Sequence, residues 1–219
     1  MIECQADCCI ALKPPKAMNY KGRRLEVTEA AWRVIVREGL DRTSMRAIAQ
    51  ELGSTTGVVT HYFRDKDELT LFALEQVFQN LFQDLAASVK GKNGLERLEQ
   101  MIFAALPVEP SGIRGWQIWI AFLGYAIGRE KLIEEHRKRY DSLQQMIHQE
   151  LTSLQLAKLI REDIDLMLEA NVLIALVDGI GIGCVIRPEQ FHADQQRHLV
   201  RRHIRTSLTI SQLIPDSQL

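Results

Sequence analysis

A short segment between Thr55 and Phe63 carries side chains suited to contact with a DNA duplex. At about 100° per residue on a helical wheel, Val59 and Phe63 fall together on an apolar side. The opposite side presents Gly57, Val58 and His61, flanked by Thr60 and Tyr62. Hydroxyl and ring groups reach phosphates or base edges, valine contacts a thymine methyl, and glycine lets the backbone approach a phosphate. The pattern is typical of a helix that lies in the major groove.

Basic residues lie on both sides of this segment, although the whole chain has a formal net charge of −1. Residues 13–70 hold 11 Lys and Arg against 8 Asp and Glu, an excess of 3 positive charges. Affinity for nucleic acid therefore has to come from a local patch. The basic positions that predict phosphate contacts are Lys21, Arg23, Arg24, Arg42, Arg46, Arg64 and Lys66. Taken singly, each fits a solvated surface equally well, and it is the ordered string that favours DNA.

Three short helices are expected to position these side chains. The first helix ends at Gly39 and shows one apolar face, formed by Val27, Ala30, Ala31, Val34 and Ile35. The second begins at Thr43 or Ser44, either of which is a good N-cap, and ends at Gly53. The third covers residues 55–63 after almost no linker. Together they have the size that a helix-turn-helix requires.

The rest of the chain also has helical periodicity, and no run alternates long enough to predict a sheet. Asp65 and Glu68 predict a capping box at the start of a long fourth helix. Further helices are expected at residues 95–106, 113–128, 131–154, 163–186 and 194–213. We therefore expect an all-α fold of about nine helices. Residues 1–18 are expected to be a disordered tail, 19–66 the helix-turn-helix domain, and 67–219 a ligand-binding and dimerisation domain.

The N-terminal segment contains Cys4, Cys8 and Cys9, which fit half a metal site, a redox sensor or a tail without function. We favour the tail, predict no metal or cofactor, and expect Met18 to be the true start with residues 1–17 an extension. No secretory signal is present. The run at residues 118–128 is too short to span a bilayer, and the run at 172–186 is interrupted by Asp178. These features predict a cytoplasmic protein without a membrane-spanning segment.

The segment from Ile48 to Leu69, IAQELGSTTGVVTHYFRDKDEL, closely resembles the TetR family of repressors. The resemblance implies a double-stranded DNA operator as partner, phosphate contacts from Thr43 and Lys66, and Thr55 as the cap of the recognition helix. It places five further residues at the DNA surface: Thr56, Val58, Thr60, His61 and Tyr62. Ser54 and Thr60 depart from the usual apolar residue and tyrosine, which leaves the choice of bases open.

Short patches at residues 57–66, 119–122 and 175–179 resemble BetI-type regulators of choline and glycine-betaine metabolism. The helix at 113–128 is apolar almost all round, so it is expected to lie at the centre of a bundle and to line any cavity. Its aromatic residues could form a cage for a quaternary ammonium ion, or could simply pack in the core. The candidate ligand residues are Trp116, Trp119, Phe122 and Tyr125, with Asp178 as a possible counter-charge.

The last two helices are expected to form a homodimer, because the resembled family packs them as a four-helix interface. Gly179, Gly181 and Gly183 would permit close approach of helices there. A two-fold dimer presents two reading helices about one DNA turn apart on a near-palindromic operator. The sequence thus predicts a ligand-responsive repressor with a choline-like effector. One alternative is a related regulator that responds to hydrophobic drugs or acyl compounds; a more distant one is an α-helical enzyme or carrier, although no catalytic motif is present.

Overall fold

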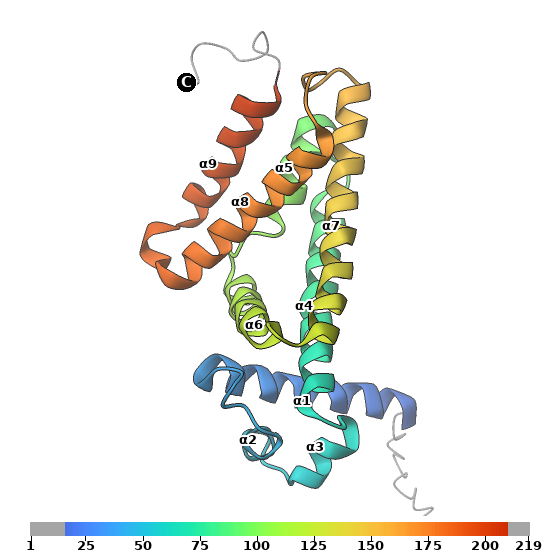
Figure 1. The fold of residues 1–219 in the computed structure, drawn as a ribbon, viewed down its shortest axis with the longest axis vertical. Helices are drawn as coiled ribbons and strands as arrows, with labels where there is room; N and C mark the ends of the chain where they lie inside the picture. Colours follow the sequence, from blue (N-terminus) through green and yellow to red (C-terminus); the bar gives the residue numbers. More distant parts are fainter. Residues whose placement is uncertain (1–15, 210–219) are drawn as a thin grey trace, which may run out of the picture.

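The structure is a computed structural model that describes residues 16–209, with side chains from Tyr20 onward. Within these residues it has nine α-helices and no strand, which confirms the all-α prediction (Figure 1). The helices are α1 (Lys16–Glu38), α2 (Met45–Glu51), α3 (Thr56–Tyr62), α4 (Lys66–Ser88), α5 (Gly94–Phe103), α6 (Pro110–Ala126), α7 (Glu130–Leu156), α8 (Leu166–Ile186) and α9 (Ala193–His203). A 3-10 turn, η1 (Pro188–Gln190), precedes α9, and a π-helical turn, η2 (Ile204–Leu208), follows it.

The N-terminal boundary differs from the expected one, because α1 begins at Lys16 and so includes the last three residues assigned to a tail. Cys4, Cys8 and Cys9 lie outside the described residues. At the other end α1 stops where expected, since Gly39 has a φ of +79°, which side chains with a Cβ rarely adopt.

The helix starts show which capping residues were identified correctly. Of the two candidates for α2, Ser44 is the N-cap, and its hydroxyl accepts from the N–H of Ala47 at 3.1 Å. Asp65 caps α4 by accepting from the N–H of Glu68 at 2.8 Å. The expected capping box is only half formed, because the Glu68 carboxylate accepts from the N–H of Arg64 instead of that of Asp65.

The helices form a small head and a longer body (Figure 1). In the head, α1 lies across the base of the body, with α2 and α3 beneath it. Helix α4 starts at the head and runs up into the body beside α7, while α6 lies between the head and the upper helices. Helix α8 packs on α7, α6 and α9.

The core has two parts that meet at α6. The lower part joins the head to α6 and the start of α7, with Phe63, Leu74 and Phe122 among its most buried side chains. The upper part joins α5, α7, α8 and α9, with Leu151 and Leu173 completely buried. Trp116 packs against both parts. The head core therefore continues into the body instead of closing on itself.

Helix α8 corrects one expectation about the membrane. The helix has 21 residues and its most apolar 18-residue window has a mean hydropathy of 1.8, so length and composition alone would let it cross a bilayer despite Asp178. It is instead a bundle helix that packs on three neighbours, although only a third of its most apolar window is buried within the chain.

Candidate DNA-binding surface and effector cavity

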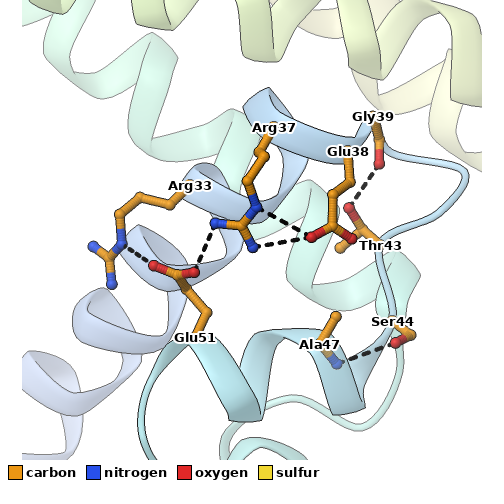
Figure 2. A network of polar contacts seen from close by, with 8 residues as sticks. All are labelled: Arg33, Arg37, Glu38, Gly39, Thr43, Ser44, Ala47 and Glu51. Carbon is orange, nitrogen blue, oxygen red and sulfur yellow. Dashed lines mark hydrogen bonds and ion pairs between the residues drawn. The ribbon is translucent and has the colours of Figure 1, made fainter.

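A polar network fixes α2 across α1 and so sets the direction of the following turn and α3 (Figure 2). Glu51 of α2 lies between two arginines of α1, at 2.7 Å from Nε of Arg33 and 2.9 Å from Nη1 of Arg37. These hydrogen bonds lower the pKa of Glu51 below its usual range, and the bond from Arg33 has the larger effect. The carboxylate therefore stays ionised at neutral pH and holds both guanidinium groups.

The face of α3 that points away from α1 and α4 is open to solvent. Val59 and the following Phe63 are completely buried, as the wheel predicts. The predicted reading residues Thr56, Gly57, Val58, Thr60 and His61 are all exposed, and Tyr62 is half-buried. Thr55 is the N-cap, but its hydroxyl makes no capping hydrogen bond among the described residues. The Thr60 hydroxyl donates back to carbonyls of its own helix, at 3.1 Å from Thr56.

The sequence analysis missed Tyr20, which completes an aromatic group on this surface. Its ring centroid lies 5.1 Å from Tyr62 and 6.2 Å from His61, and those two rings lie 4.9 Å apart. Tyr20 is 43% exposed. It lies on α1, more than 40 residues before His61 and Tyr62 in the sequence. A tyrosine just before the basic run of Lys21 was the available signal.

The basic residues around α3 divide into exposed and engaged groups. Arg42 and Arg46 are exposed, and neither has an ion pair within the described part of the chain. Arg24 is engaged, because its guanidinium lies over the rings of Phe63 and Phe72 at 4.6 and 4.3 Å and reaches Glu68 at 3.2 Å. Arg24 therefore helps to hold the head together, and the expected phosphate contact does not fit its position.

Thr43 and Lys66, the two phosphate ligands implied by family resemblance, are not free in the structure. Thr43 is 3% exposed, its hydroxyl donates to the Gly39 carbonyl at 2.8 Å, and its N–H donates to Leu40 at 3.1 Å. The ammonium of Lys66 lies 3.4 Å from the Asp41 carbonyl and 4.7 Å from the centre of the Tyr125 ring. Burial lowers the pKa of Lys66. Both residues are placed to support the turn that leads into α2.

Tyr125, which the sequence assigned to ligand binding, joins the body to the head. Its hydroxyl donates to Asp67 at 2.6 Å, and Arg129 lies over its ring at 3.8 Å and donates to its carbonyl. Burial and the Asp67 carboxylate raise the pKa of Tyr125 to about 12, so the hydroxyl keeps its proton. Tyr125 does not line the cavity described next; it lies six residues beyond Trp119 on α6, where the helix meets the head.

A cavity of about 440 Å³ lies inside the body, within the usual range for small-molecule sites. Three of the five candidate ligand residues line it: Trp116, Trp119 and Asp178. The two indole rings meet edge to face at 5.0 Å. Phe122 does not line the cavity; it is 1% exposed and packs in the lower core. The sequence also missed Tyr140 and Trp32, which both line this space.

The polar end of the cavity holds a tyrosine and a carboxylate. The Tyr140 hydroxyl donates to Asp178 at 2.5 Å, and its ring lies nearly parallel to that of Trp119 with centroids 6.2 Å apart. Burial raises the pKa of Asp178, while the bond from Tyr140 opposes that effect. Burial and the same carboxylate also raise the pKa of Tyr140. Trp119, Tyr140 and Asp178 together offer aromatic faces and a carboxylate, which suits a small cation; Asp84 and Arg114 also line the cavity.

His136 lies directly behind this wall. Its ring is 4.8 Å from Tyr140, 5.5 Å from Phe122 and 5.9 Å from Trp119, measured between centroids. Burial, with a smaller effect of Arg139, lowers the pKa of His136 to about 4. The histidine is therefore neutral at pH 7, and its Nδ1 has no partner within the described chain.

Two glycines of α8 make room for aromatic rings of the same chain. A Cβ on Gly181 would lie 2.4 Å from the Trp116 ring, and a Cβ on Gly183 would lie 2.5 Å from Phe191. The third, Gly179, is exposed and has nothing within 4 Å of that position. Gly181 and Gly183 thus shape the interior of the chain, whereas the sequence predicts that all three serve an interface.

The outer side of α8 carries an exposed stripe of six small or apolar residues. They recur every three or four positions along the whole helix, which places them on one side. The residues are Leu168, Val172, Ala175, Gly179, Ile182 and Ile186, and Ile186 is 69% exposed. Leu199 on α9 is also exposed.

Comparison with known protein families gives two matches. Residues 27–71 match the model of the tetR family of bacterial regulatory proteins. Residues 94–209, more than half of the chain, match the C-terminal domain of BetI-type transcriptional repressors. The boundary between the two matches lies within or just after α4.

Individual relatives align over most of their length. The regulator PksA of Bacillus subtilis is 29% identical over 194 residues, covering 87% of this chain and 92% of that protein. The regulator BetI of Vibrio vulnificus is 29% identical over 202 residues, covering 89% and 97%. A transcriptional regulator from Saccharomonospora viridis, solved in complex with choline, has a TM-score of 0.80 and 25% identity over 87% of this chain and 99% of its own.

Proposed function

We propose a function on the premise that this protein belongs to the TetR family of bacterial regulatory proteins and carries the C-terminal domain of BetI-type transcriptional repressors. It represses genes by binding an operator, and it releases that operator when a small organic cation enters its cavity. Family membership makes the protein a DNA-binding transcriptional regulator, which confirms the function expected from residues 48–69. We propose no catalytic role. Its place of action would be the cytoplasm, where the chromosome lies.

The exposed face of α3 is the observation that supports DNA reading by these particular residues. Val58 and His61 project from a helix whose other side is fixed by Val59 and Phe63 in the core. Arg46 and Arg42 on the neighbouring segment are available for phosphates. We propose that residues 19–66 read a double-stranded operator, with Thr43 and Lys66 acting through the turn they support.

The effector class rests on the cavity. Trp116, Trp119 and Tyr140 offer ring faces, and Asp178 supplies a negative charge at the same end. A quaternary ammonium ion is attracted by ring faces, and because it has no N–H group the protein need not provide a hydrogen-bond acceptor for it. The choline-bound relative supports the same class. We therefore propose choline or a closely related cation as the effector.

A hydrophobic effector is the second candidate, because most of the remaining lining is apolar, including Leu85, Ile102 and Val177. Thermal unfolding separates the two. Choline at 100 times its Kd would stabilise the protein by about 2.7 kcal/mol, which raises Tm by roughly 5–10 °C for a chain of this size. A shift with decanoate and none with choline or glycine betaine would reject the cation.

The exposed stripe on α8 supports a homodimer formed by α8 and α9. Two such faces would cover each other around a two-fold axis and would place two heads on one operator. Light scattering at micromolar concentration should give twice the chain mass. Ile182→Asp should give monomers, whereas Leu156→Asp, an 81% exposed position at the end of α7, should not. A monomeric wild-type protein would contradict the proposal.

A further inference from the structure

Trp32 is the unexpected member of the cavity wall, because it belongs to α1 of the DNA-binding head. The other lining residues come from the body segments between α4 and α8. Trp32 is half-buried, and its indole N–H is buried without an acceptor within the described residues. A molecule in the cavity would therefore lie against part of the head itself.

The same helix also touches the reading surface. Tyr20, 12 positions before Trp32, has its ring 5.1 Å from Tyr62 and 6.2 Å from His61 of α3. At a rise of about 1.5 Å per residue, the two aromatic side chains lie roughly 18 Å apart along the axis. Helix α1 is continuous between them. One rigid element thus has one end against the cavity and the other against the residues that face DNA.

We propose that Trp32 is an effector-contact residue, so that the effector acts on α1 directly as well as on the body helices around it. The effector that makes this contact would combine a cationic group, held by Trp119, Tyr140 and Asp178, with a part that reaches the Trp32 indole. The face of a ring, or an acceptor atom, on that part would accept the indole N–H. Displacing Trp32 shifts α1 and, through Tyr20, the position of His61 and Tyr62.

The inference rests on the proposed use of the cavity as effector site, and the contact with Trp32 can be tested separately from the class of effector. The chain has three tryptophans, and all three line the cavity. Labelling the full-length protein with 5-fluorotryptophan gives three fluorine resonances. Single Trp→Phe variants at positions 116 and 119 assign two of them, and the third is Trp32 in the wild-type chain.

The probes are choline, benzyltrimethylammonium and decanoate. We expect the Trp32 resonance to shift with benzyltrimethylammonium together with that of Trp119. If both cations shift Trp116 and Trp119 while Trp32 stays fixed, the Trp32 contact is wrong and the cation site stands. If only decanoate shifts all three resonances, the cation class is wrong and the Trp32 contact stands. No shift with any probe would overturn both.

A second measurement separates contact from coupling. The coupling is the ratio of DNA Kd with saturating benzyltrimethylammonium to DNA Kd without it, measured on a duplex selected from a random pool. Because it is a ratio, any change in effector-free DNA affinity cancels. Trp32→Phe should reduce this ratio at least fivefold, whereas Trp116→Phe should weaken binding of the cation and leave the ratio at saturation within twofold. An unchanged ratio in Trp32→Phe would refute transmission through α1.

Discussion

The proposed reading surface and the proposed effector cavity are built in opposite ways. The surface comes mainly from one stretch of chain, Arg42 to Tyr62, which the ring of Tyr20 joins from α1. The cavity draws its wall from positions as far apart as Trp32 and Asp178. A local surface follows from helical periodicity, whereas a cavity depends on how several helices pack. Substitutions should therefore have graded, separate effects on the surface and larger, coupled effects in the cavity.

The largest effect is expected at Gly181. In Gly181→Val the added Cβ would overlap the Trp116 ring, which has to move into the cavity. We expect a loss of about 1–3 kcal/mol in the free energy of unfolding from overpacking. Calorimetric titration should show no measurable choline binding.

The matched control is Gly124→Ala on α6, where nothing lies within 4 Å of the added Cβ. This exposed helical position should gain roughly 0.5–1 kcal/mol, because alanine favours the helix over glycine. If neither substitution lowers the free energy of unfolding, the Trp116 ring does not pack against Gly181.

The next largest effect is expected from the Asp178 carboxylate in the cavity. Asp178→Asn should weaken choline binding by about 10–100-fold, since it removes the anion and keeps the shape. Because burial raises the pKa of Asp178, the wild-type affinity should fall as the pH is lowered and the carboxylate takes up a proton. Titration calorimetry between pH 4 and 8 tests this, and equal choline affinity of both proteins across that range would exclude Asp178 as the counter-charge.

His136 should make the lower core sensitive to acid. Its pKa is about 4 in the folded protein and 6.5 as an ordinary value. Above pH 6.5 the group is neutral in both states, so its contribution to stability is complete there. Between pH 6.5 and 4 the unfolded chain binds the proton first, and about 1–3 kcal/mol of stability should be lost. Urea unfolding of His136→Phe should lack this part of the pH dependence; an unchanged slope would mean that another group causes it.

The smallest effects are expected on the reading surface. Arg46→Ala should weaken binding to all duplexes alike and lower the slope of log K against log salt by about 1. Val58→Ala should instead change the preferred base at one operator position severalfold. Selecting bound duplexes from a random DNA pool at a fixed salt concentration distinguishes the two variants. The reverse pattern would show that the reading face is misplaced.

The sequence predicted the fold and the head well because their signals are local. Gly39, Ser44 and Asp65 marked helix ends correctly, and Val59 and Phe63 marked the buried side of α3. The exposure of the reading residues followed from the same wheel. Their contacts with bases and phosphates stay predictions.

The sequence predicted the cavity less well because packing across helices decides it. Phe122 and Tyr125 follow Trp119 on α6, but by that point the helix has passed the cavity and meets the head. Trp32 and Tyr140 lie on helices whose own periodicity gives no reason to place them beside Trp119. The surroundings of Thr43 and Lys66 could not be predicted for a similar reason, since their partners, Gly39 and Tyr125, lie outside the motif.

The exposed stripe on α8 has a consequence for how the regulator responds to its own abundance. If two chains must meet to cover Leu168, Ile182 and Ile186, the active form at low concentration grows with the square of the amount synthesised. Halving expression would then cut operator occupancy by up to fourfold. In a monomer, the apolar stripe of α8 would stay exposed to water. Newly synthesised chains should therefore dimerise quickly or be degraded.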